Sequence, residues 1–386
     1  MENKVKVSLK LKTASIGMIL IGVLALIMAF MQDAGRAWAN ILLNNYTFLS
    51  IVIGATFFIA IQYITQSGWS AMFKRVPEAI SGFMPIIGLL MLVMIFGVPY
   101  LYEWSHEDMR NSHEIIQHKS PYLNTIFFII RMILFLSLWM LIIFKFRKFS
   151  LKEDEIVGME FFNKSEFLSK VFIFVMAITF SLGTFDWVMS VDVTWFSTVY
   201  AFKNIASAFY HAAAVIIVVV LLLKNLGYFP KMNKFHLQDF SRYLFALSIL
   251  WAYLWFIEYL LIWFANIPEE TSYYVQRREG NWNTMFYLDI FINFIIPFLL
   301  LLPIQFDRNK YILFFVAGLL IFGQWITNFI QIMPGTIHDF HIGFFEIGIY
   351  MGYLGLFILV VSQNLSKAPI IPKNHPFLLE SEQHHF

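Results

Sequence analysis

Ten apolar stretches, separated by short polar segments, run along the 386 residues of the chain. Each stretch is close to or longer than the about 20 residues that an α-helix needs to cross about 30 Å of hydrocarbon. We therefore predict an all-α polytopic membrane protein with ten transmembrane helices. The predicted spans, numbered one to ten, cover residues 12–31, 46–66, 80–102, 122–144, 166–187, 195–223, 241–267, 284–303, 311–333 and 343–363.

The composition supports this class of protein. Hydrophobic residues make up 59% of the chain and charged residues 13%, whereas soluble domains contain about 45–50% and about 25% of these residues. A water-soluble core of this size could not bury so much apolar surface. We therefore treat residues 1–386 as a single integral membrane domain and exclude the soluble enzymes.

Basic residues are distributed unequally between the two predicted sides of the membrane. The side that holds both termini carries 19 Lys and Arg residues, and the other side carries 5. Because basic residues near span ends stay in the cytoplasm, we expect both termini to be cytoplasmic. The apolar run from Ala14 to Met31 is longer than the core of a cleaved signal peptide, so we expect the first span to be retained.

The order of the spans predicts an internal organisation. Spans two to five and spans six to nine each make four passes that start from the same side, which permits a parallel repeat. We expect two four-helix bundles, residues 46–187 and 195–333, with peripheral helices at 12–31 and 343–363. The two halves are not obviously alike in sequence, so this division is a topological inference.

Several predicted spans contain ionisable side chains. Such a residue is costly in hydrocarbon and needs a partner, a watery cavity or a function. Counting about 1.5 Å per residue places Arg131, Lys203 and Glu258 at a shared depth of about 12–14 Å below the outer surface, which predicts an ion-pair network. His211 lies deeper. The other polar residues in or at the end of the spans are Asp186, Asp289, Asn293, Gln324, Asn328 and Glu346.

Helical spacing gathers polar residues on one face of each of spans six to nine, since positions three or four apart are neighbours. Polar faces turn towards protein or water rather than lipid, so we expect a polar interior that opens outward. Two interpretations stay open. The residues form only structural hydrogen bonds and neutralised pairs, or Lys203, Glu258 and Asp186 line a functional cavity.

The residue types exclude several kinds of cofactor. The chain has no cysteine, which excludes thiolate-held iron–sulfur clusters, Cys-ligated zinc and c-type haem attachment on this chain. His211 is the one histidine well inside a predicted span, so a haem held by two such histidines is excluded. It is either a structural histidine or a residue that relays protons or hydrogen-bonds a quinone. We assign no catalytic residue and no metal site.

The remaining composition adds two expectations. A net charge of +2 and the lack of a phosphate-binding motif give no reason to expect nucleic acid as a partner. Aromatic residues at span ends are expected to form an interfacial belt. These residues are Trp104, Tyr122, Trp187, Trp195, Tyr273, Tyr274 and Trp282.

Two segments resemble a known family. Residues 185–200 read FDWVMSVDVTWFSTVY, and residues 251–263 read WAYLWFIEYLLIW. Together with the ten-span layout they resemble the second polysulfide-reductase-type integral membrane subunit of alternative complex III, a bacterial quinol:electron-acceptor oxidoreductase. The resemblance covers essentially the whole chain, and the first segment is the more specific. The second segment is followed by matching positions at Asn266, Pro268, Glu269, Glu270, Thr271 and Tyr274.

This resemblance implies a subunit of a respiratory-chain complex in the bacterial inner membrane, surrounded by lipids. The implied partners are periplasmic iron–sulfur and c-type haem subunits and a homologous quinol-binding membrane subunit. This chain would carry no haem or cluster itself, and quinone binding to it stays open. The implied proton-handling positions are Asp186, Asp192, Lys203, His211 and Glu258. Further candidates for a proton pathway or a place near quinone are Arg131, Asp289, Asn293, Gln324 and Glu346.

Two other functions stay open. A stand-alone secondary transporter also fits four-helix repeats with charges near the midplane, and it would have helices broken at matching places. The interruptions at Gly183 and Pro297 do not correspond. A membrane enzyme of lipid chemistry would need an acid–base or metal set at the interface, and residues 338–341, His-Asp-Phe-His, are the candidate for it.

Overall fold

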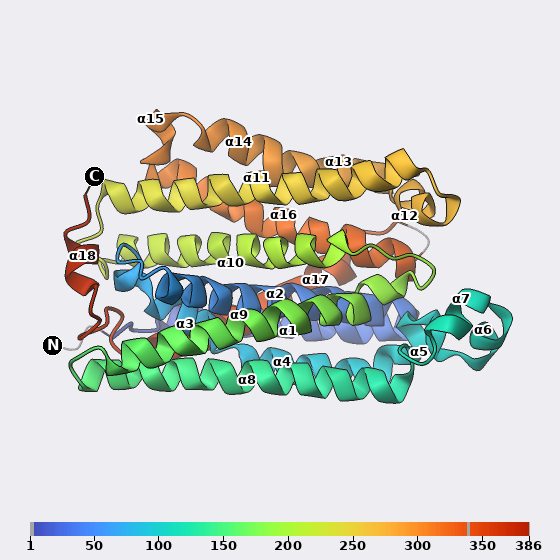
Figure 1. Ribbon diagram of the computed structural model, residues 1–386, viewed down its shortest axis with the longest axis horizontal. Helices are drawn as coiled ribbons and strands as arrows, with labels where there is room; N and C mark the ends of the chain where they lie inside the picture. Colours follow the sequence, from blue (N-terminus) through green and yellow to red (C-terminus); the bar gives the residue numbers. More distant parts are fainter. Residues whose placement is uncertain (1–3, 338–339, 386) are drawn as a thin grey trace.

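The computed structural model describes residues 4–337 and 340–385. In this part of the chain, ten helices are long and apolar enough to cross a membrane, which confirms the predicted all-α, ten-span protein. They lie side by side along the long axis of the molecule (Figure 1). The spans are Leu9–Gln32 (α1), Ala34–Ile64 (α2), Arg75–Leu101 (α3 to α5), Thr125–Glu155 (α8), Glu160–Val191 (α9, Glu160–Trp187, and a short 3-10 turn), Val199–Asn225 (α10), Lys234–Ala265 (α11), Trp282–Leu301 (α13, a π-helical turn and α14), Lys310–Thr336 (α16) and Phe344–Ser366 (α17).

Short helices complete the chain at both ends of the bundle. At one end, which holds both chain termini and which we call the terminal end, lie α15 (Ile304–Asp307) and α18 (Leu378–Glu382). At the other end, the distal end, lie α6 (Glu107–Ser112), α7 (Glu114–Lys119) and α12 (Pro268–Arg278) (Figure 1). The distal end corresponds to the side predicted to face outward.

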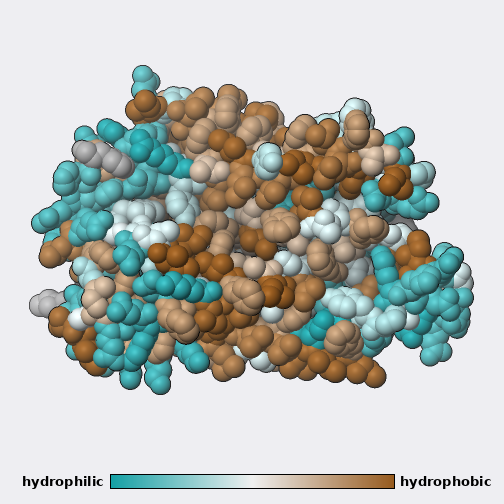
Figure 2. Space-filling model, in the orientation of Figure 1, coloured by the Kyte–Doolittle hydropathy of each residue, from teal (hydrophilic) through white to brown (hydrophobic). Residues whose placement is uncertain are grey.

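The surface agrees with a membrane location. Figure 2 shows hydrophilic residues gathered at the terminal and distal ends and hydrophobic residues over the middle of the helices. This is the distribution that a bilayer requires, since polar groups at the two interfaces stay hydrated while the middle contacts acyl chains. The cytoplasmic position of the terminal end stays a prediction from the basic residues.

Helix α2 begins at Ala34, earlier than the predicted residue 46. The stretch before residue 46 contains Asn40, Asn44 and Asn45, which hydropathy treats as a loop. All three side chains are buried, and the amide of Asn45 donates to the carbonyl of Leu90 at 2.8 Å. Because α2 is surrounded by protein, its asparagines find partners that lipid would not offer.

Helices α2 and α10 form the centre of the molecule. They are the two spans with the largest buried share, and they contact each other along their lengths as well as α9 and α16. At Gly54 the backbones approach so closely that an added Cβ would lie 2.1 Å from the carbonyl oxygen of Ala208. Only glycine fits there.

Substituting Gly54 with valine is therefore expected to prevent the α2–α10 contact and to abolish most of the folded protein. The measurement is the fraction of monodisperse protein in size-exclusion chromatography after detergent extraction. Gly17→Val is the control, because a Cβ at Gly17 meets nothing within 4 Å. Equal yields of the two variants would contradict the account of this contact.

Helices α1 and α17 form a close pair. An added Cβ on Gly22 would lie 2.3 Å from the Cα of Gly352, and small residues of this kind let transmembrane helices approach each other. Helix α1 has the smallest buried share of the ten spans and contacts mainly α17. The division of the remaining helices into two four-helix bundles stays a prediction.

Candidate functional site

Lys203 of α10 and Glu258 of α11 form an ion pair inside the membrane-spanning region. Their side chains are 5% and 0% exposed, and Nζ of Lys203 contacts Oε2 of Glu258. The hydroxyl of Tyr274 donates to the same oxygen at 3.1 Å. Their shared depth below the outer surface predicts that Lys203 and Glu258 take part in one ion-pair network, and in the structure the two side chains are in contact.

Tyr274 reaches Glu258 because the chain folds back at the end of α11. Asn266 adopts a left-handed conformation (φ 50°), which ends α11, and Pro268 then starts α12. Helix α12 therefore lies across the distal end and presents Tyr274 inward. Burial, and then the nearby carboxylate of Glu258, raise the pKa of Tyr274 well above its ordinary value. Tyr274 thus stays a phenol that can donate its proton to the hydrogen bond.

Helix α12 is fixed by a buried cation. The guanidinium of Arg277 donates to Asp192 at 2.8 Å and to the carbonyls of Ile330 and Gln331 at 2.9 and 3.0 Å. The ring of Tyr273 stacks on Trp195 with centroids 3.9 Å apart. Asp192, a predicted proton-handling residue, therefore pairs with Arg277 and helps to hold α12 in place. Its ion pair is with Arg277 and not with Lys203 or Glu258.

A hollow of about 420 Å³ opens beside Tyr274 at the distal end. Its walls come from the end of α11, from α12 and from the start of α13 (Trp282–Ile290), and they include Tyr259, Trp263 and Arg278. Arg278 donates to the hydroxyl of Tyr259 at 2.7 Å. Tyr274 lines this hollow and hydrogen-bonds Glu258, so one side chain links the buried carboxylate to the hollow.

Asp289 is the centre of a second polar group. It accepts hydrogen bonds from Asn293 at 2.8 Å and from Thr327 at 2.6 Å, and Gln324 donates to Asn293 at 2.9 Å. Asn293 lies in a π-helical turn, Phe291–Ile295, a rare local structure that is frequent at functional sites.

Arg131 does not join the predicted network. It forms two hydrogen bonds with Asp186, at 2.7 and 3.0 Å, and its guanidinium lies over the ring of Tyr122, 3.9 Å from the centroid. The prediction of one network through Arg131, Lys203 and Glu258 is therefore wrong. Equal depth fixes a residue along the helix axis but not the direction in which its side chain points.

Glu346 connects two helices through hydrogen bonds. Arg36 donates to both of its carboxylate oxygens at 2.8 Å, Asn40 donates at 3.1 Å, and the backbone N–H of Gly343 donates at 2.8 Å. The carboxylate joins the start of α17 to the start of α2. Its contacts lie with these two helix starts and not with the Lys203–Glu258 pair.

His211 is buried in the middle of α10, and its Nε2 has no hydrogen-bond partner among the described residues. The same holds for polar atoms of Ser207 and Tyr200 on this helix and for Oε1 of Glu258 and the indole N–H of Trp251 on α11. Buried polar atoms of this kind are normally bonded to protein or to internal water. These side chains of α10 and α11 therefore keep donors and acceptors that the described residues do not satisfy.

The expected aromatic belt is mostly wrong. Trp104, Trp187, Trp195, Tyr273 and Tyr274 are buried in the protein, as is Trp282. Their rings pack on one another and on loops at the distal end, for example Tyr102 on Trp104 and Trp195 on Tyr273. Span-end position does not distinguish a lipid-facing ring from one covered by a loop.

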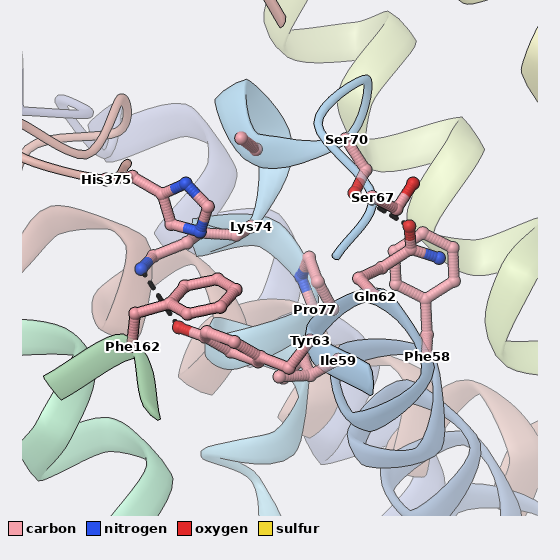
Figure 3. Close-up of a pocket in the computed structure, with 11 residues that line it drawn as sticks. Phe58, Ile59, Gln62, Tyr63, Ser67, Ser70, Lys74, Pro77, Phe162 and His375 are labelled. Atoms are coloured by element: carbon pink, nitrogen blue, oxygen red, sulfur yellow. Dashed lines mark hydrogen bonds between the residues drawn. The ribbon is translucent and has the colours of Figure 1, made fainter. Parts of the chain in front are cut away.

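A charged cluster at the terminal end was not predicted from the sequence. Lys74 contacts Glu153 and donates to the hydroxyl of Tyr63 at 3.2 Å. His375 and Phe162 line the same pocket as Lys74 and Tyr63 (Figure 3). Arg75, Glu78, Asp154 and Arg147 continue the cluster. The sequence does contain opposite charges in the segments 67–79 and 145–165, which lie between predicted spans, and these charges could have indicated the pairing. The structure places these residues at the ends of long helices.

We expect His375 to make the docking of the C-terminal segment depend on pH. Burial, and then the charge of Lys74, lower the pKa of His375 to about 2 from an ordinary value of 6.5. The docked segment therefore keeps this histidine neutral, and its stability is complete above pH 6.5 and is lost progressively as the pH falls below it.

We expect limited proteolysis after residue 366 to accelerate between pH 7 and pH 5, and His375→Phe to weaken this acceleration. Phenylalanine fits because Phe162 and Phe377 already surround the ring. A pH profile of cleavage that is unchanged in His375→Phe would contradict the role of this histidine.

No family model and no curated protein matches the chain. Among the described residues, no group of three or more His, Cys, Asp or Glu side chains could hold a metal ion. His338 and Asp339, half of the predicted acid–base motif, lie outside the described residues. The chain is a ten-span, all-helical membrane protein with charged pairs buried between its helices.

Proposed function

We propose that this protein is a membrane subunit of a multisubunit quinol oxidoreductase in the respiratory chain of a bacterial inner membrane. Its contribution is a proton-conducting polar interior centred on Lys203 and Glu258, together with assembly of the complex. Haem c and iron–sulfur clusters belong to periplasmic partner subunits in this proposal, and a homologous membrane subunit binds the quinol. The resemblance of residues 185–200 and 251–263 to alternative complex III supports this assignment.

The observation that carries the proton-handling role is the link from Glu258 through Tyr274 to the distal hollow. Burial favours the protonated form of a carboxylate, and a neighbouring cation favours the ionised form. In this proposal the balance shifts during turnover, so that Glu258 takes up and releases a proton. Tyr274 can pass a proton between the carboxylate and water in the hollow.

In the other direction, away from the distal end, the proposed path follows α10. The unpartnered polar atoms of Tyr200, Ser207 and His211 follow one face of the helix away from the distal end. Beyond His211, residues 212–223 are apolar on this helix. The proposed exchange is therefore with the distal side, where the periplasmic partner subunits would dock.

A stand-alone transporter has less support. The helices are interrupted at Met94–Gly97 in span three and at Phe291–Ile295 in span eight. In the predicted repeat these are the second helix of one bundle and the third helix of the other. Transporters with repeated halves break their helices at corresponding positions, so these interruptions do not support a transporter.

Purification from native membranes through a C-terminal tag tests this function. In mild detergent we expect a large assembly with additional subunits, whose redox difference spectrum contains c-type haem. Subunit identification should find iron–sulfur proteins. A colourless particle that contains only this chain would contradict the proposal and would favour the transporter.

A further inference from the structure

A cleft of about 320 Å³ lies between α3 (Arg75–Ser81), α4 (Met84–Val93), α8 and the end of α17, towards the terminal end. Its polar part is lined by Glu78, Arg147, Asn364 and Lys367. Met140, Ile143 and Phe144 form an apolar wall on α8. The cleft therefore has a basic end beside the interface and an apolar end within the membrane.

The apolar end continues into a second hollow of about 190 Å³ between α4 and α8, which shares Pro85 and Met140 with the first. This hollow reaches Ile133. From Arg147 to Ile133 the helix rises by about 20 Å, somewhat more than the about 15 Å of hydrocarbon in one leaflet. The two hollows form a groove long enough for one acyl chain.

The charges at the basic end favour an anion. Arg147 donates to Glu78 at 2.6 Å, and Arg75 bonds both Glu78 and Asp154. The two carboxylates are thus matched by two arginines. Lys367, which donates to the side-chain oxygen of Asn364 at 2.9 Å, adds a third positive charge. Among the described residues, Arg147 donates to one side chain, the carboxylate of Glu78, so its guanidinium keeps further N–H groups for a ligand.

We propose that this groove binds an anionic phospholipid, with the phosphate at Arg147 and Lys367 and one acyl chain between α4 and α8. Basic pockets between transmembrane helices select anionic headgroups, while the groove supplies the contact area for the chain. A zwitterionic lipid brings its own cation to a cleft that is already positive. The bound lipid fills the space between α4 and α8 and stabilises their packing.

The test uses the purified full chain after lipid removal in detergent, with the thermal unfolding midpoint as readout. Phosphatidylglycerol is expected to raise the midpoint, and phosphatidylcholine is not. In Arg147→Gln/Lys367→Gln, roughly tenfold or more phosphatidylglycerol should be needed for the same rise. The matched control is Lys145→Gln/Lys148→Gln, which removes two exposed charges from the same end of α8 and should respond as the parent does.

Three further arms keep the test decisive. Lys367→Gln alone changes an exposed residue and should weaken the response even if the double variant fails to fold. Gly88→Phe fills the second hollow and should reduce the response to the lipid. Inorganic phosphate should have no effect, so stabilisation by phosphate alone would replace the lipid with a free anion. An equal response to both lipids, or an equal loss in the control, would overturn the proposal.

Discussion

Replacing Glu258 with glutamine is expected to lower quinol oxidation by the purified complex about 100-fold or more, because a positioned acid–base group contributes about 10²–10⁴-fold to a rate. Glutamine has nearly the same shape and can still accept the hydrogen bond from Tyr274, but it cannot release a proton. Because the variant also leaves Lys203 buried without its carboxylate, turnover is compared at equal amounts of assembled complex. The measurements are quinol turnover and the number of protons released per quinol in proteoliposomes.

Two further variants separate proton handling from structure. Glu258→Asp keeps an acid and is expected to recover part of the turnover, which a purely structural role for the carboxylate would not predict. Glu269→Gln removes an exposed carboxylate from α12 at the same end and should behave as the parent. Unchanged turnover and proton release in Glu258→Gln would rule out the proposed role of this residue.

The second large effect concerns stability. Replacing Arg131 with methionine leaves Asp186 buried without its two hydrogen bonds, and breaking a buried pair in this way costs about 3–5 kcal/mol. We expect a marked fall in the thermal unfolding midpoint of the detergent-solubilised protein. Adding Asp186→Asn removes the stranded charge and should restore most of the loss.

This double-variant comparison also decides between the two interpretations of Asp186. If the residue only neutralises Arg131, the restored double variant should keep the proton release of the parent. If Asp186 carries protons, the double variant should fold but release fewer protons. A single Arg131→Met variant that unfolds at the parental temperature would contradict the pairing itself.

The sequence predicted the helices better than their partners. Runs of apolar residues locate spans because the bilayer imposes a single length on all of them. The prediction was wrong at α2, where Asn40 and Asn45 are hydrogen-bonded inside the protein. That mistake also hid the partner of Glu346, since Arg36 had been placed in a loop.

Depth along the helices identified Lys203 and Glu258 but could not separate them from Arg131. Three residues at one depth can point towards different neighbours, and only the packing of α8 against α9 shows that Arg131 reaches Asp186. Tyr274 was assigned to the membrane interface because nothing in a linear sequence shows that α12 folds back over α11. The link between Glu258 and the hollow therefore required the structure.

Redox-induced infrared difference spectroscopy of the purified complex tests the central claim most directly, because it detects the protonation of individual carboxyl groups. We expect a protonated-carboxyl band that changes on quinol oxidation, is absent in Glu258→Gln and is retained in Glu269→Gln. A Glu258→Gln spectrum that matches the parent in this region would show that Glu258 does not change its protonation during turnover and would contradict the account.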